Sequence, residues 1–157
     1  MLRFGKATTV DVRRSVANAE HDRYKRERAK LALKYPPVVF DGRQARAIGR
    51  GFADYVGRSG LPIWACAILP EHVHLVIGRT DQPVEQRVNQ LKGAATRQLN
   101  AERINPTQGR HPPFARSCWK VFLDRATDID RAIEYVERNP HREGKPAQRW
   151  TCVRMRP

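Results

Sequence analysis

The sequence predicts an α+β fold in which helices pack on one face of an antiparallel sheet, preceded by a basic helical arm. Two observations support this prediction. Three stretches place apolar residues three and four positions apart, as amphipathic helices do, and short β-rich runs lie between them. A chain of 157 residues buries one core and little more. We therefore expect the arm over residues 1–36 and a single domain over residues 37–157.

The expected arm is dense in charge. Between Thr8 and Tyr35 the chain carries eight basic and four acidic residues, and this stretch has neither Gly nor Pro. Such a composition favours a solvated helix, which Pro36 and Pro37 then end.

Two helices and a hairpin are expected next. Apolar side chains spaced three and four apart predict amphipathic helices over residues 43–58 and 84–99. Between them, the apolar runs 61–69 and 72–78 are interrupted only by Pro70-Glu71. This pattern predicts two strands joined by a turn.

A third strand and a third helix are expected after a loop over residues 105–113. Apolar and polar residues alternate over residues 116–123, which is typical of a strand. Thr127 or Asp128 should then cap a helix that stops at Asn139, before the proline that follows. Helices interleaved with hairpin strands on this scale favour a ferredoxin-like arrangement.

The charge balance predicts a partner that is a polyanion. Lys and Arg number 30 against 16 Asp and Glu, which gives a formal charge of +14. Charge alone does not distinguish between DNA, RNA and an anionic membrane surface as the partner. No apolar run reaches the roughly 18 to 20 residues of a membrane span, and the N-terminus has no apolar region of a secretion signal. We therefore expect a cytoplasmic protein without a membrane partner.

The three cysteines predict no disulfide framework and no structural zinc site. Cys66, Cys118 and Cys152 are far apart in the sequence and form no C-x-x-C pair. Free cysteines most often serve as small apolar residues.

Two histidines form the first candidate for chemistry. His72 and His74 are two positions apart in an expected strand, where side chains alternate between faces, so both imidazoles project from the same face. Such a pair can bind a divalent metal, which needs a further ligand from elsewhere in the chain. The alternative is two polar histidines on a half-exposed strand.

The third helix carries the second candidate. At ~100° per residue, Tyr135 and Asn139 lie one turn apart at the rim of an apolar stripe. A tyrosine there can rest its ring on the core and place its hydroxyl in a cleft, and the amide can offer an oxygen to a metal. The alternative is a boundary tyrosine and a helix-ending asparagine.

Together these segments resemble one protein family. Residues 69–77, LPEHVHLVI, are similar to a signature of single-tyrosine HUH transposases, including the REP-associated tyrosine transposases. In that signature a hydrophobic residue is followed by Pro, by Asn or Glu, by His-hydrophobic-His and by further hydrophobic residues. Residues 132–144 resemble the family's YI-x-x-NP-x-x-x-G helix. Two shorter matches lie between them. Leu91-Lys92-Gly93 with Arg97 resembles the family's LKG…R helix, and Trp119, Phe122 and Asp124 resemble its W…F…D strand.

The resemblance, which covers residues 38–144, implies a function. Tyr135 would be the nucleophile, and His72, His74 and Asn139 would hold Mg²⁺ or Mn²⁺. The reaction would be transposase-like cleavage and strand transfer of single-stranded DNA, with hairpin ends, through a 5′-phosphotyrosine link. A ferredoxin-like sheet and a homodimer are implied as well. The chain differs from the family in one respect. Family members usually have a strand just before the first helix, and in this chain the charged arm occupies that position.

Contacts to the DNA are expected from basic and aromatic side chains. Candidates for the backbone contacts are Lys92, Arg97, Arg116 and Lys120, each of which is otherwise a solvated surface charge. Candidates for base stacking are Trp64, Trp119 and Tyr55, for which the alternative is packing in the core.

Three other functions stay open on the sequence. A catalytically inactive DNA-binding module would keep the basic surface, and a basic RNA-binding protein would contain the two histidines by accident. A hydrolytic metal nuclease would use the same histidines with water in place of the tyrosine.

Overall fold

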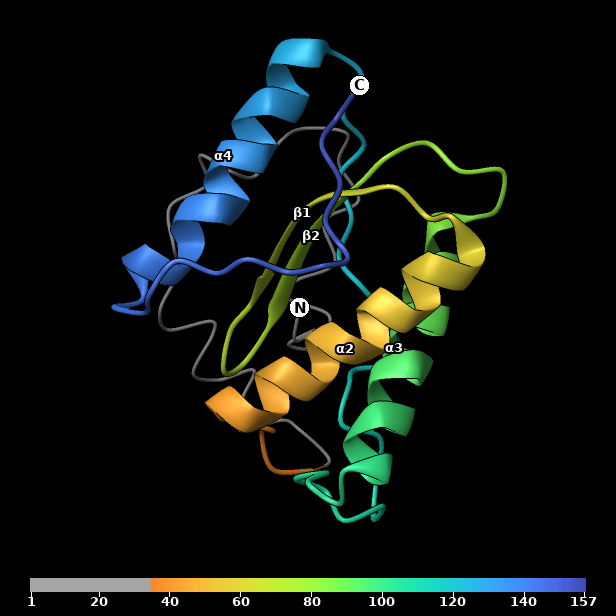
Figure 1. Ribbon diagram of the computed structural model, residues 1–157, viewed down its shortest axis with the longest axis vertical. Coiled ribbons are helices and arrows are strands. Elements are labelled where there is room, and N and C mark those ends of the chain that lie inside the picture. The colour runs from red at the N-terminus through yellow and green to blue at the C-terminus, as the bar shows by residue number, and fades with distance from the viewer. Residues whose placement is uncertain (1–34) are drawn as a thin grey trace.

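The computed structural model describes residues 35–157, and these form an α+β domain with three helices and a two-stranded antiparallel sheet (Figure 1). The expected arm over residues 1–36 lies outside the described residues, except for its last two. Among the described residues, no helix has both the length and the apolar composition that a membrane span requires. In chain order the elements are α2 (Gly42–Ser59), β1 (Ile63–Ile68), β2 (Val73–Ile77), α3 (Val84–Ala101) and α4 (Ala126–Arg142).

Helix α2 begins and ends where its local sequence provides caps. The side chain of Asp41 accepts hydrogen bonds from the backbone N–H groups of Arg43 and Gln44, both at 2.8 Å. The Gln44 side chain accepts one in return from the Asp41 backbone, which completes a capping box. Gly60 ends the helix with φ of 68°, a conformation that glycine adopts without a steric penalty.

The predicted hairpin is confirmed. Strands β1 and β2 pair antiparallel, with Ala67 opposite His74 and Ile68 opposite Val73. The Leu69 N–H donates to the carbonyl oxygen of His72 at 2.9 Å, which closes the turn at Pro70-Glu71. The hairpin thus places the two histidines at the start of β2.

Helices cover both faces of this hairpin, so the expectation of helices on one face is wrong. The side chains of Cys66 and Ile68 belong to a core that α2 and α3 complete. Those of Ala65 and Ala67 point the other way and pack against Val136 of α4. Figure 1 shows the hairpin between α4 on one side and the pair α2 and α3 on the other. Because β1 is apolar on both faces, one layer of helices would leave apolar side chains in water.

The expected third strand does not form among the described residues. Residues 118–125 have no strand partner, and the Phe122 side chain is 73% exposed. A strand needs a neighbour for its backbone groups, and none of the described strands lies beside this segment. Its beginning is fixed by the Lys92 ammonium, which donates to the carbonyl oxygens of Ala115 and Ser117 at 2.8 and 3.0 Å.

The C-terminal segment covers the outer edge of β1, which the sequence did not predict. Val153 bridges Ile63 in the parallel direction, and the Arg154 N–H donates to the Ile63 carbonyl oxygen at 2.8 Å. The Gln148 side chain bonds to both the N–H and the carbonyl oxygen of Ile68. Within the described part of the chain, β2 pairs only with β1, and no described strand pairs with its other edge.

Helix α4 runs through Pro140 to Arg142 and does not stop at Asn139 as expected. A proline in a helix removes one donor, and the cost is smaller near the end of a helix, where backbone bonding is already irregular. Here the Glu143 N–H donates to the carbonyl oxygens of Asn139 and Pro140, and Lys145 also donates to Pro140. The extra turn brings Arg142 and Glu143 beside the hairpin.

Candidate metal and nucleophile site

The two histidine rings lie together on the face of the hairpin that α4 covers. His72 immediately precedes β2 and His74 lies within it. Their ring centroids are 4.7 Å apart, and the ring planes are inclined by 81°. Val76, the next residue on this face of β2, packs in the same cluster as Val136 of α4.

His74 is held in the neutral form. Burial and the charge of the neighbouring His72 ring lower the pKa of His74 to about 3. At neutral pH its imidazole therefore carries a lone pair, which is the form that binds a metal ion.

Tyr135 reaches the histidines from α4. Its ring centroid lies 5.8 Å from that of His74, in an edge-on arrangement. The residue is 40% exposed, so its hydroxyl can meet a substrate. The guanidinium carbon of Arg142, two turns further along the same helix, lies 5.2 Å from the centroid of the Tyr135 ring.

Asn139 follows Tyr135 by one turn and is the buried polar residue of this face. It is 6% exposed, and its side-chain nitrogen is buried without a hydrogen-bond partner. An unpartnered buried amide costs about 1 to 3 kcal/mol, so its presence needs a reason.

These residue types fit a divalent metal. Among the described residues, no three His, Cys, Asp or Glu side chains come together as a metal site, so a third ligand from these residues would be of another kind. The side-chain amide of Asn139, one helical turn from Tyr135, offers an oxygen that can bind a hard cation.

A wide groove opens at this site and is lined in part by β2. Its volume is about 1890 Å³, above the ~300 to 1,000 Å³ of small-molecule pockets, so it suits a polymer better than a metabolite. His74, Tyr135 and Arg142 lie in its wall. Eight Lys and Arg side chains and four Asp and Glu line the groove, which makes it net positive.

Two of the four basic residues expected to contact DNA line this groove. They are Lys92 and Lys120, whereas Arg97 and Arg116 are exposed elsewhere. Burial lowers the pKa of Lys92, whose ammonium holds the loop carbonyls described above. Lys120 forms an ion pair with Glu85 of α3.

Two of the three aromatic candidates for base stacking line the groove, and the third is buried. Trp64 and Trp119 line the groove. Tyr55 is 8% exposed, and its hydroxyl donates to Gln90 and accepts from Arg87. For Tyr55 the alternative of packing in the core therefore holds.

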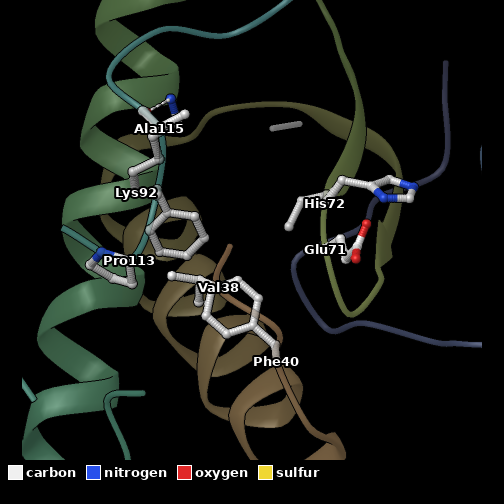
Figure 2. A pocket seen from close by; sticks show the side chains of 9 residues that line it. Val38, Phe40, Glu71, His72, Lys92, Pro113 and Ala115 are labelled. Atoms are coloured by element: carbon white, nitrogen blue, oxygen red, sulfur yellow. Dashed lines mark hydrogen bonds between the residues drawn. The ribbon is translucent and has the colours of Figure 1, made fainter. Parts of the chain in front are cut away.

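A second hollow, next to His72, is too small for a ligand. Figure 2 shows it between Val38 and Phe40 on one side and Lys92 on the other, with the His72 ring turned away from the two apolar residues. Its volume of about 20 Å³ corresponds to about one water molecule.

Sequence reasoning missed two charged residues of this site. Arg142 faces Tyr135, and a carboxylate oxygen of Glu143 lies 3.4 Å from Nε2 of His72. Both became part of the site because α4 continues past Pro140. The signal for Arg142 was its position seven residues after Tyr135, which is two helical turns.

Comparison of the chain with models of protein families, with curated proteins and with solved structures found no match.

Proposed function

We propose that this protein cleaves and transfers single-stranded DNA, with Tyr135 as the nucleophile and a divalent metal at His72, His74 and Asn139. One observation carries the proposal. His74 of the hairpin and Tyr135 of α4 come from distant parts of the chain, yet their ring centroids lie 5.8 Å apart at the wall of a basic groove. The resemblance to single-tyrosine HUH transposases supports the same assignment.

In the proposed reaction, the Tyr135 oxygen attacks the phosphorus of a phosphodiester. The bond from that phosphorus to the 3′ oxygen of the upstream nucleotide breaks. The phenol loses its proton, and the leaving 3′ oxygen takes one up. Because the new phosphotyrosine is itself a phosphodiester, a 3′ hydroxyl can later reverse the step without ATP.

The residues around Tyr135 have separate tasks. His72, His74 and Asn139 would hold Mg²⁺ or Mn²⁺, which when bound supplies positive charge to the phosphate in the transition state. Arg142 places a second positive charge beside the tyrosine ring, where negative charge develops on the oxygen. The mostly buried His74 and the buried Asn139 are held by packing, while the exposed Tyr135 faces the groove.

The groove favours a single strand as the substrate. Trp64 and Trp119 offer aromatic faces for unpaired bases, and basic side chains surround them. Hairpin ends on the DNA, a homodimer, a completed ferredoxin-like sheet and a cytoplasmic location follow from the sequence and its resemblance, and they stay predictions.

The test uses the full chain with single-stranded oligonucleotides that carry a 5′ or a 3′ label, in Mn²⁺ or Mg²⁺. The oligonucleotides include hairpins from the flanks of the protein's own coding region. The proposal predicts a metal-dependent covalent adduct that carries the 3′ label and is lost in His74→Ala. An adduct that forms equally well in EDTA would contradict the metal's part in the reaction.

A second candidate is an inactive DNA-binding module. It is favoured because only two strands form among the described residues, fewer than the ferredoxin-like sheet that the resemblance implies. This module would bind the same oligonucleotides in a salt-dependent manner and form no adduct with either metal.

A further inference from the structure

Glu143 is an acidic side chain that the structure pairs with a proposed metal ligand, His72. Its Oε1 lies 3.4 Å from Nε2 of His72. The two side chains are 36% and 18% exposed, so the contact is partly shielded from water. A contact of this kind is worth more than one on the open surface.

The position of Glu143 on α4 is unfavourable for a carboxylate. Glu143 is the C-cap residue, where the partial negative charge of the helix end favours cations, and His141 and Arg142 precede it. The helix end itself therefore gives no stabilisation to an acid at this position.

The proposed ligands His72, His74 and Asn139 carry no negative charge, whereas Glu143 carries one. Two imidazoles and an amide are neutral ligands, whereas Mg²⁺ and Mn²⁺ favour sites with negatively charged oxygen. Carboxylates that contact a metal-bound histidine fix its ring and its tautomer and raise its basicity.

We propose that Glu143 is a positioning residue of the metal site, which orients the His72 imidazole and adds negative charge that His72, His74 and Asn139 do not provide. This inference rests on the proposed function, since it assumes that His72 and His74 hold the metal. It assigns a role in metal affinity to a residue outside the expected ligand set.

The experiment measures Mn²⁺ binding to the full chain by calorimetry, without DNA. Glu143→Gln keeps the shape of the side chain and removes its charge, and Glu143→Ala removes both. We expect Kd for Mn²⁺ to rise about 10- to 100-fold in both variants and to recover in part in Glu143→Asp. Glu137→Gln, an exposed acid on the same helix, is the matched control and should bind as the unmodified chain does.

Thermal unfolding of the metal-free variants separates this role from a structural one. Removing a negative charge from the end of α4 should leave the melting temperature unchanged or raise it slightly. A Kd for Glu143→Gln within twofold of the unmodified chain would overturn the inference, as would an equal loss in Glu137→Gln.

The failure of the proposed function would look different. If the unmodified chain bound no Mn²⁺, or if His74→Ala bound it equally well, the metal site itself would be wrong and the inference would fall with it. If His74→Ala abolished binding while Glu143→Gln did not affect it, only the inference would fail.

Discussion

The two faces of the β1–β2 hairpin are packed in different ways. The face toward α2 and α3 is a closed apolar core, in which Ile48, Leu91 and Leu99 are fully buried. There the helices approach so closely that a Cβ on Gly51 would lie 2.8 Å from the Ala94 carbonyl oxygen. The face toward α4 has a small cluster of alanines and valine, followed by histidines, a tyrosine and an unpartnered asparagine.

This difference separates stability from chemistry. Apolar burial on the first face supplies most of the stabilisation, since it scales with the area removed from water. On the second face, a buried amide without a partner costs stability. Polar groups retained at such a cost are typical of functional sites. Substitutions on the two faces should therefore change different properties.

The largest effect is expected in the closed core. Leu99→Ala should lower the free energy of unfolding by about 2 to 5 kcal/mol, because Leu99 is fully buried and its removal leaves a cavity. Chemical denaturation followed by circular dichroism measures this. Arg97→Ala, an exposed change on the same helix, should stay within about 0.5 kcal/mol. Equal losses in the two variants would mean that this face is not a closed core.

Asn139→Leu should change stability in the opposite direction. Replacing the unpartnered amide by an apolar side chain of similar size should raise the free energy of unfolding by about 1 to 2 kcal/mol and abolish Mn²⁺ binding. Denaturation and calorimetry on the same samples test both effects. A loss of stability would show that the amide supports the fold, and the contrast between the two faces would not hold.

Arg142→Gln should slow the reaction without weakening the metal site. The guanidinium lies 5.2 Å from the Tyr135 ring and contacts no proposed ligand, so the rate of adduct formation should fall at least about tenfold while Kd for Mn²⁺ stays the same. Arg58→Gln is the control, because Arg58 pairs with Asp54 on α2 and does not line the groove. Similar rates in the two variants would exclude a specific role for Arg142.

The smallest effect is expected at the rim of the groove. Lys120→Gln removes one cation, so the slope of log K against log salt for single-stranded DNA should decrease by about 0.7. The ion pair with Glu85 can reduce this value further. Arg58→Gln changes an exposed cation of α2 that does not line the groove, and it should leave the slope unchanged. Equal slopes in all three proteins would place the DNA elsewhere.

The sequence predicted the elements that depend on local patterns. Helices α2 and α3 and the hairpin follow from the spacing of apolar residues within each segment, and they were placed to within a few residues. The juxtaposition of His72 and His74 also followed from local geometry, since it depends only on the alternation of side chains along a strand.

Features that depend on distant partners were not predicted correctly. Residues 116–123 have the alternation of a strand, but no described strand lies beside them. The segment around Gln148 has no strand pattern and is fixed by bonds to Ile68, 80 positions away. The rule that proline ends a helix placed the end of α4 too early, and so hid the contacts of Arg142 and Glu143.

The most direct test of the central claim identifies the amino acid that carries the DNA. After reaction with single-stranded DNA and Mn²⁺, the adduct is digested with nuclease and trypsin and sequenced by mass spectrometry. Cleavage after Arg131 and Arg138 releases residues 132–138, AIEYVER, in which Tyr135 is the only hydroxyl-bearing side chain. We predict a nucleotide on this tyrosine and no adduct in Tyr135→Phe. A nucleotide on another peptide, or cleavage that persists in Tyr135→Phe, would contradict the claim, and the latter would indicate water as the attacking group.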